Sequence, residues 1–509
     1  MSPTLARPTP QPQPPAASSV WPRYPSLYEI NTWVWLTDLS TKYGRPIDLA
    51  SVPAAEWDAI AALGFNAVWL MGVWERSPAG IAIANNNPGL LADFRRALPD
   101  FRPEDNVGSA YAIRNYVVDP HLGGPAALAA ARAQLAQRGM NLLLDFVPNH
   151  VAPDNPWATD HPEYFLAATA DDARNNPGCY ITVNGTVCAC GRDPFFPPWP
   201  DVLQLNAFNP KLREAVIQTL AGIAAQCDGV RCDMAMLVLN SVFERTWSNR
   251  VGPPPPTEYW TDIITATKKH HPGFLFIAEA YWDLEWQLQQ LGFDFCYDKK
   301  LYDRLEHDTA ENVRLHLCAD MAYQNRLIRF IENHDEPRAA ATFSPAKEQA
   351  LAVTTFTLPG AKLYYEGQLE GRKVRPPVFL DRRPPEPVDD ALRAFYTKLL
   401  AAVNQPLFHD GRWSLLERSG WPDNSSFQNL VAWSWQTDDV RCLVAVNLSD
   451  TPLHALVHVP WAGNRTWDLT DVFSGTTYRR DGNDIAERGL YLELAPWAFN
   501  LFRVVEVPA

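Results

Sequence analysis

The chain has 509 residues, a formal net charge of −14 at pH 7 and 47% hydrophobic residues. This length is too great for one small core and predicts a large domain with at least one further module. An acidic chain lacks the basic surface that nucleic-acid binding requires, and no run of about 18 apolar residues could span a membrane. We therefore expect neither a nucleic-acid partner nor membrane insertion.

The first segment, residues 1–20, is rich in Pro, Gln and Ala and lacks the apolar core of a signal peptide. This composition predicts a disordered Pro-rich tail. Without an export signal, a cytoplasmic location is expected. No feature of the sequence indicates a particular oligomeric state.

Eight short apolar runs follow the tail, separated by longer amphipathic or polar stretches that are typical of helices. The runs are 26–36, 66–74, 141–150, 228–235, 274–281, 293–299, 326–335 and 361–368. This alternation predicts an α/β fold, a (β/α)8 TIM barrel. Two insertions are expected, one after the second strand (75–118) and a short one after the third strand (151–203).

The character of the sequence changes after the amphipathic stretch 389–404. Alternating strands are expected at 430–436, 441–449, 455–460 and within 490–505. Such alternation is typical of an antiparallel sheet with one face on a core. We predict a barrel domain over 21–405, including the 151–203 insertion, and a C-terminal antiparallel β-sandwich over 406–509.

Polar and charged side chains interrupt four of the eight runs near their C-terminal ends, where a barrel of this type builds its active site. They are Asp145, Asn149, His150, Arg231, Asp233, Glu279, His334 and Asp335. One carboxylate alone at such a place would favour a helix cap or an ion pair between strands. The occurrence of these groups at one depth on four strands favours a shared site.

Paired carboxylates of this kind suit glycoside cleavage, in which one attacks the anomeric carbon and a second donates a proton to the leaving oxygen. Arg231 and Asp233 are two residues apart in a strand and therefore share one face. The guanidinium would keep that carboxylate ionised. The apolar neighbours of Glu279 would raise the pKa of its carboxyl, as a proton donor requires.

Four motifs together resemble the signature regions of the α-amylase family of glycoside hydrolases (glycoside hydrolase family 13). They are DFVPNH (145–150), GVRCDMAM (229–236), FIAEAYW (276–282) and FIENHDEP (330–337). The segments 108–124 and 357–368 are also similar to that family, and the resemblance covers about residues 26–405. The C-terminal part resembles the family's β-sandwich.

This resemblance implies that Asp233 is the nucleophile, Glu279 the general acid/base and Asp335 the stabiliser of the transition state. It also implies a set of substrate-binding residues: Tyr111, Asp145, His150, Arg231, Trp282 and His334. Tyr111 would stack on the sugar or belong to the core. Asp145 would brace the site or touch the sugar. For the two histidines the alternative is a buried imidazole with satisfied hydrogen bonds.

The chain departs from the family pattern at two places. Met236 and Leu237 stand where many amylases carry a Lys-His pair. Gln204 stands where an Asp calcium ligand is often found, and Asn149 alone is a poor ligand set for a cation that takes six to eight oxygens. We therefore predict no cofactor, with the usual calcium site absent or weak.

Three segments leave alternatives open. The aromatic loop 191–201 could line a sugar subsite or form a packed lid. The basic loop 370–387 could be solvated, or could place Arg372, Lys373 or Arg375 near an anionic acceptor such as phosphate. Around an Asn184-Gly185 hairpin turn, a cluster of thiols could bind metal, form a disulfide or do neither: Cys179, Cys188 and Cys190.

These observations predict a retaining α-glucoside hydrolase that acts on α-1,4-glucan or malto-oligosaccharides. The alternative is a transglycosylase or glucanotransferase with the same catalytic residues, because the glycosyl-enzyme intermediate can be captured by a sugar instead of water. A remote alternative is an inactive carbohydrate-binding protein. Such proteins usually lose one of the three acids, and this sequence keeps them all.

Overall fold

The computed structural model describes residues 21–507, so the tail expected over 1–20 lies outside the described residues. Eight parallel strands close into a barrel in the order β1-β14-β13-β12-β11-β10-β5-β2. Their bounds are β1 (Ser26–Asn31), β2 (Ala67–Met71), β5 (Asn141–Phe146), β10 (Gly229–Cys232), β11 (Leu275–Ala278), β12 (Phe295–Tyr297), β13 (Leu327–Arg329) and β14 (Ala361–Tyr365). Each lies within one predicted run, and the TIM barrel is confirmed.

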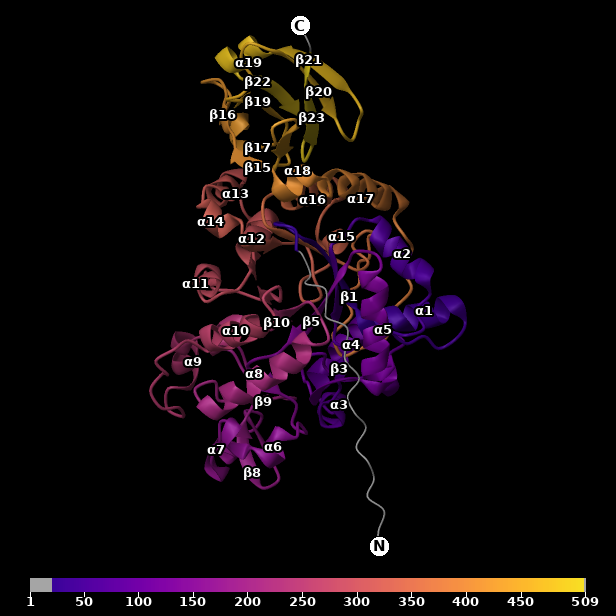
Figure 1. Cartoon of the computed structure of the whole chain (residues 1–509), viewed down its shortest axis with the longest axis vertical. Helices are drawn as coiled ribbons and strands as arrows, with labels where there is room; N and C mark the ends of the chain where they lie inside the picture. The colour runs from indigo at the N-terminus through magenta and orange to yellow at the C-terminus, as the bar shows by residue number, and fades with distance from the viewer. Residues whose placement is uncertain (1–20, 508–509) are drawn as a thin grey trace.

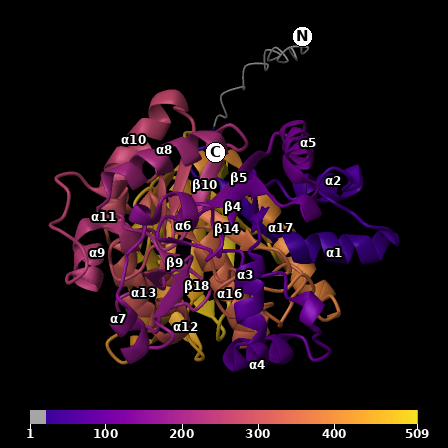
Figure 2. The same cartoon turned by 90° about the horizontal axis from the view of Figure 1, so that it is seen from below.

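Helices surround the strands (Figure 2), which explains why the strands are apolar on both faces. Leu27 and Trp69 fill the barrel interior, whereas Tyr28 and Val68 point outward against the helices. The main surrounding helices are α1 (Thr32–Tyr43), α2 (Ala54–Ala62), α5 (Gly124–Ala136), α8 (Pro210–Ala224), α10 (Tyr259–His270), α12 (Lys299–His307), α16 (Pro345–Phe356) and α17 (Asp390–Val403).

Two insertions interrupt the barrel, one between β2 and β5 and the other between β5 and β10. The first contains β3 (Trp74–Glu75), α3 (Pro78–Asn85), α4 (Pro88–Ala97) and β4 (Asn115–Val118). The second contains β6 (His150–Val151), α6 (Trp157–Asp160), α7 (Ala170–Asn175), β7 (Tyr180–Val183), β8 (Thr186–Ala189) and β9 (Leu203–Gln204). β6 pairs with β9, which returns the chain to the barrel. The second insertion lies at the end of the molecule opposite the C-terminal domain (Figure 1).

The C-terminal part forms two antiparallel sheets, as predicted. One has six strands in the order β15-β17-β18-β23-β20-β21 and the other three in the order β16-β19-β22. Their bounds are β15 (Arg412–Leu415), β16 (Glu417–Ser419), β17 (Leu430–Gln436), β18 (Arg441–Asn447), β19 (Leu453–His458), β20 (Thr466–Asp471), β21 (Thr477–Asp481), β22 (Leu490–Leu494) and β23 (Phe499–Val507). Region 490–505 therefore holds two strands, separated where Trp497 adopts a left-handed φ of 56°.

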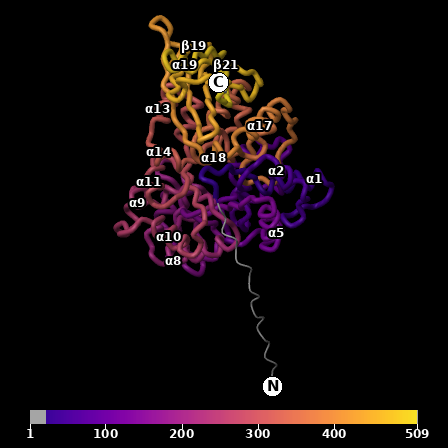
Figure 3. The backbone as a smooth tube through the Cα atoms, turned by 45° about the horizontal axis from the view of Figure 1, so that its top comes forward, coloured from indigo at the N-terminus to yellow at the C-terminus, as the bar shows by residue number. Residues whose placement is uncertain are grey.

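The six-stranded sheet packs on the barrel with one face and on the smaller sheet with the other. Figure 3 shows the C-terminal part at the end of the molecule where α17 lies. Trp433 and Trp435 belong to the core shared with the barrel. The intervening Ala432 belongs to the core between the two sheets, since side chains alternate along a strand. The Trp435 indole N–H donates to the carbonyl oxygen of Thr357, 2.6 Å away, at the end of α16. A packed apolar interface therefore joins the two domains.

Among residues 21–507, no helix combines the length and the apolar character needed to cross a membrane.

Candidate active site

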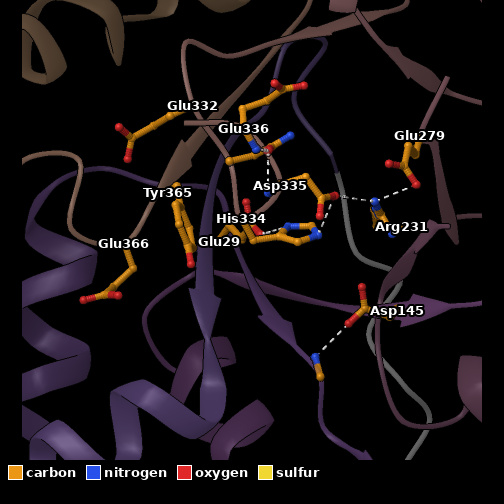
Figure 4. A network of polar contacts seen from close by, with 12 residues as sticks. Glu29, Asp145, Arg231, Glu279, Glu332, His334, Asp335, Glu336, Tyr365 and Glu366 are labelled. Atoms are coloured by element: carbon orange, nitrogen blue, oxygen red, sulfur yellow. Dashed lines mark hydrogen bonds and ion pairs between the residues drawn. The ribbon is translucent and has the colours of Figure 1, made fainter. Parts of the chain in front are cut away.

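The polar groups at the ends of the barrel strands meet at one place (Figure 4). Arg231 lies in β10, and Asp233 follows the last residue of that strand. Glu279 directly follows β11. His334 and Asp335 lie in the loop after β13. These residues lie at or just after the C-terminal ends of their strands, so their side chains occupy the mouth of the barrel.

Arg231 holds this group together. Its side chain is 1% exposed, its Nη1 lies 2.7 Å from Asp233 Oδ1, and its Nη2 lies 2.7 Å from Glu279 Oε2. Nη2 is also 3.7 Å from Asp335 Oδ2. The guanidinium faces three aromatic rings at 5.1 to 5.7 Å: Trp69, Tyr111 and Tyr297. The carboxylates and the faces of the aromatic rings attract the guanidinium, and this attraction offsets the free-energy cost of removing its charge from water.

Glu279 has the environment expected of a proton donor. Burial raises the pKa of its carboxyl to about 7; Arg231 opposes this effect, and the negative charges of Asp233 and Asp335 add to it. The Tyr281 hydroxyl donates to Oε1 at 2.8 Å. Near neutral pH, Glu279 can therefore carry the proton that a leaving oxygen needs.

The backbone beside Glu279 is strained. Met234 has a φ of 40°, in the left-handed region that a non-glycine residue rarely adopts. Its N–H donates to Glu279 Oε2 at 2.5 Å. This conformation turns the chain after Asp233 and aims an amide at the neighbouring acid, which orients its carboxyl group.

His334 lies between two carboxylates. Its Nδ1 hydrogen-bonds to Glu29 from β1, and its Nε2 lies 2.9 Å from Asp335 Oδ2 and 2.6 Å from the Tyr111 hydroxyl. Burial alone would lower the pKa of His334, but Asp335 and Glu29 raise it to about 10. Burial alone would raise the pKa of Asp335. The contact with His334 outweighs that effect and lowers the pKa of the carboxyl to about 2. The side chain of Asp335 is 40% exposed, so this ionised acid reaches the surface at the mouth of the barrel.

The other predicted substrate-binding residues surround this centre at different places. Tyr111 stacks on His334, with 5.4 Å between ring centres. His150 lies on β6, with its ring centre 5.1 Å from that of Trp199, and burial lowers its pKa. Trp282 lies farther out, against Phe195 of the second insertion.

Asp145 is fully buried, and its Oδ2 accepts a hydrogen bond from the Gly72 N–H at 2.8 Å. The Trp74 indole donates to the Asp145 carbonyl oxygen at 2.7 Å. These contacts favour the alternative in which Asp145 braces β5 against the segment after β2.

Three contributors were not predicted from the sequence: Glu29, Tyr281 and Tyr297. Glu29 is a charged residue inside an apolar strand run, the signal that identified Asp145 and Arg231, so it could have been found. The Tyr297 hydroxyl accepts from Arg231 Nε at 3.3 Å. A tyrosine in a buried strand carries no such signal, because it is also an ordinary core residue.

The segment where the family resemblance would place calcium contains a hydrogen-bond donor among its oxygens. Gln204 Nε2 lies 2.9 Å from both the carbonyl oxygen and Oδ1 of Asn149, and 3.0 Å from the carbonyl oxygen of Leu205. All three partners are acceptors, so the amide nitrogen must face them. A calcium ion would need the space and the oxygens that this NH₂ group uses. The residues present do not fit a calcium ion.

The thiol cluster lies on the second insertion. The Asn184-Gly185 turn joins β7 and β8 as the predicted hairpin. In the described part of the chain all eight cysteines are free thiols. Over the same residues, no three His, Cys, Asp or Glu side chains gather in a way that could hold a metal ion.

The basic loop 370–387 is less solvated than expected for an ordinary loop. Arg383 is buried and contacts Glu366 and Asp38 at 2.5 and 2.6 Å. Arg382 pairs with carboxylates of the first insertion. Among the three cations considered for an anionic acceptor, Arg375 does approach the site, since its Nη1 donates to the Asp335 carbonyl oxygen at 2.5 Å.

Much of the chain is similar to known proteins. The family model of the α-amylase catalytic domain matches residues 54–375, more than half of the chain. The α-amylase MalA of Haloarcula japonica is 24% identical over 437 residues, which cover 84% of this chain and 55% of that protein. An α-1,4-glucan:maltose-1-phosphate maltosyltransferase of Rhodospirillum rubrum is 28% identical over 238 residues, covering 45% of this chain and 28% of that enzyme. The chain thus spans about half or less of these relatives.

Solved structures share the architecture. The maltogenic α-amylase AmyB of Thermotoga neapolitana aligns with a TM-score of 0.67 at 19% identity, covering 95% of this chain and 99% of that one. An α-amylase of Geobacillus thermoleovorans, complexed with acarbose, aligns with a TM-score of 0.65 at 19% identity, covering 96% and 99%. At these identities the likeness establishes the fold.

Proposed function

Because the chain belongs to the α-amylase family, we propose that it is a retaining α-glucoside hydrolase that acts on α-1,4-glucan or malto-oligosaccharides. The observation that carries this proposal is the contact of one guanidinium, that of Arg231, with Asp233 and Glu279 at 2.7 Å each. Retaining enzymes need their two carboxyl groups close together, since one must attack the carbon directly. The catalytic unit is residues 21–405, and no cofactor takes part.

In the first step, Asp233 attacks the anomeric carbon while Glu279 transfers its proton to the leaving oxygen. The glycosidic bond breaks, and a covalent glycosyl ester forms on Asp233. In the second step, Glu279 takes a proton from water as the water oxygen attacks the anomeric carbon and frees Asp233. The pKa of about 7 for Glu279 suits both roles, because a group that alternates between acid and base works best near the ambient pH.

Asp335 and His334 act on the sugar ring. The ionised Asp335 is partly exposed and would stabilise positive charge that develops on the ring in the transition state. His334 carries a positive charge and holds Asp335 in place at 2.9 Å. Tyr111, His150 and Trp282 would contact the substrate from the rim.

Turnover of maltoheptaose followed by chromatography tests this proposal. We expect shorter malto-oligosaccharides, and NMR of the first product should show the α-anomer, because two displacements retain configuration. An initial β-anomer, or no turnover of any α-glucan, would contradict it.

Transfer is the second candidate, and it is supported by the maltosyltransferase among the relatives. The same glycosyl ester would then be captured by a sugar hydroxyl or another acceptor instead of water. Excess maltose added to the maltoheptaose reaction distinguishes the two activities. Products longer than the donor favour transfer, whereas an unchanged ladder of shorter products favours hydrolysis.

A further inference from the structure

A pocket apart from the catalytic group lies where both insertions meet α8. Its volume is about 270 Å³, close to the lower end of the range of small-molecule sites, about 300 Å³. One wall comes from β4 of the first insertion, a second from the start of α6 in the second insertion, and the third from α8. The pocket therefore suits a small unit rather than a long segment of polymer.

The side chains that line this pocket are polar but uncharged. Thr219 contributes a hydroxyl, and Tyr116 and Trp157 contribute aromatic rings. In the described part of the chain no Asp, Glu, Lys or Arg lines it, although 20% of the sequence is charged. Such a lining selects a neutral ligand that both donates and accepts hydrogen bonds. The largest contribution is from four amides: Asn115, Asn155, Gln218 and Gln226.

Two of these amides are held so that one polar atom remains free. Asn155 is only 7% exposed, and its Oδ1 accepts from the Trp157 N–H at 2.9 Å, whereas its Nδ2 has no partner among residues 21–507. The Gln226 Nε2 donates to the Gly222 carbonyl oxygen at 3.0 Å, which leaves Oε1 as an acceptor. A buried donor without a partner is costly, so the free Nδ2 indicates a ligand. A fixed donor and a fixed acceptor match neighbouring hydroxyl groups.

Trp157 supplies an aromatic wall beside these amides. Its ring meets that of Tyr164 edge-on, with 5.5 Å between the ring centres and 88° between the ring planes. The indole is therefore held in place before a ligand arrives, which reduces the entropy lost on binding. A sugar ring presents C–H groups on its faces and hydroxyls around its edge, so an aromatic wall next to neutral amides is complementary to it.

Tyr116 shows how the pocket lies relative to the catalytic centre. Its hydroxyl accepts from the Val147 N–H at 2.9 Å and donates to the Val147 carbonyl oxygen at 3.2 Å. Val147 directly follows β5 and precedes His150 by three residues. None of the three acids lines the pocket. A sugar bound here would thus leave the acids free for a second sugar segment.

We propose that this pocket is a non-catalytic carbohydrate site that binds the end of a neutral glucan chain. A terminal sugar ring packs on Trp157, and its hydroxyls hydrogen-bond with Asn155 Nδ2 and Gln226 Oε1. The preference for a neutral sugar follows from the lining, whereas the choice of an α-linked glucan rests on the proposed function. A chain held at this pocket would raise the effective concentration of glucan at the catalytic centre.

Calorimetric titration with maltotriose on the Asp233→Asn background counts the binding sites without turnover. We expect Trp157→Ala to remove one site per chain. Gln226→Ala, which removes the free acceptor from a partly exposed position after α8, should raise the Kd of that site about tenfold. Trp286→Ala is the matched control. Trp286 is 49% exposed on α11 (Glu285–Gln290), so this variant loses an exposed tryptophan elsewhere and should bind like the parent.

An unchanged number of sites and an unchanged Kd in Trp157→Ala overturn the proposal, as does the same loss in Trp286→Ala. Should Trp157→Ala not fold, as judged by circular dichroism, Gln226→Ala decides, and a Kd within twofold of the parent overturns the site. A wild-type protein that keeps this Trp157-dependent site but cleaves no glucan would contradict the proposed function and leave the site standing. Cleavage of maltoheptaose without a Trp157-dependent site would do the reverse.

Discussion

The Nδ1 atom of His334 hydrogen-bonds to the carboxylate of Glu29, which precedes it by 305 residues. Both side chains are fully buried. Glu29 comes from β1, which pairs with β14 and β2, so this contact forms only when the barrel is closed. The charge of the imidazole that contacts Asp335 thus depends on the correct assembly of the whole barrel.

Glu29→Gln keeps the shape of the side chain and removes its charge. We expect the pKa of His334 to fall from about 10, and kcat/KM to drop about tenfold, which corresponds to about 1.4 kcal/mol of transition-state stabilisation. NMR titration of the His334 ring and steady-state kinetics measure the two effects. An unchanged imidazole titration would refute this role of Glu29.

The same variant has a predicted effect on stability. The folded-state pKa of His334 is raised, so its ionic contribution is fully present below about 6.5 and is lost as pH rises through about 10. The difference in unfolding free energy between wild type and Glu29→Gln should therefore be largest near pH 6 to 7 and shrink toward pH 10. Denaturant unfolding at several pH values measures it, and a difference that grows with pH would contradict the sign.

Asp233→Asn should abolish turnover, because an amide cannot form the glycosyl ester. We expect a loss of kcat of at least about 10³-fold with the fold retained by circular dichroism. Asp228→Asn is a matched control from the same segment. Asp228 lies just before β10 and pairs with Arg132 at 2.7 Å, whereas Asp233 follows the other end of that strand. Removing the charge of Asp228 should therefore affect stability more than kcat. Equal losses of kcat in both variants would remove Asp233 from the nucleophile role.

Activity should decline above about pH 7, where Glu279 loses the proton that the leaving oxygen requires. Burial is the main cause of this raised pKa, so the alkaline limb should lie about 2.5 pH units above the ordinary value of 4.5 for a glutamate. Initial rates of maltoheptaose cleavage from pH 4 to 9 measure it. A rate that is constant to pH 9 would mean that another group donates the proton.

Removal of divalent cations should not change the stability of the wild-type protein, because the Gln204 amide already satisfies the oxygens of Asn149 and Leu205. Thermal unfolding with and without a chelator tests this. Gln204→Asp should lose about 3 kcal/mol, since a buried carboxylate would face those oxygens, and calcium should restore part of the loss. One tightly held calcium ion in dialysed wild-type protein would disprove the prediction.

The sequence predicted the barrel, and the meeting of polar groups at its mouth, for a physical reason. A charged residue in an apolar strand run is costly, so Arg231 and Glu279 were conspicuous, and parallel strands carry their C-terminal ends to one mouth. The contact of Phe195 with Trp282 could not be predicted in this way, because it joins two loops whose paths depend on the folded insertion. The role of Gln204 could not be predicted either, because only the folded structure shows that its amide lies among three acceptors.

The core shared by Trp433, Trp435 and the barrel helices has a practical consequence for protein engineering. Deleting the sandwich would uncover the apolar side chains that now contact its larger sheet, including Tyr24, whose ring centre lies 6.0 Å from that of Trp435. A barrel produced alone would be prone to aggregation, and heat should unfold both parts in a single cooperative transition. Chimeras that exchange C-terminal modules between relatives would have to transplant this contact surface with them.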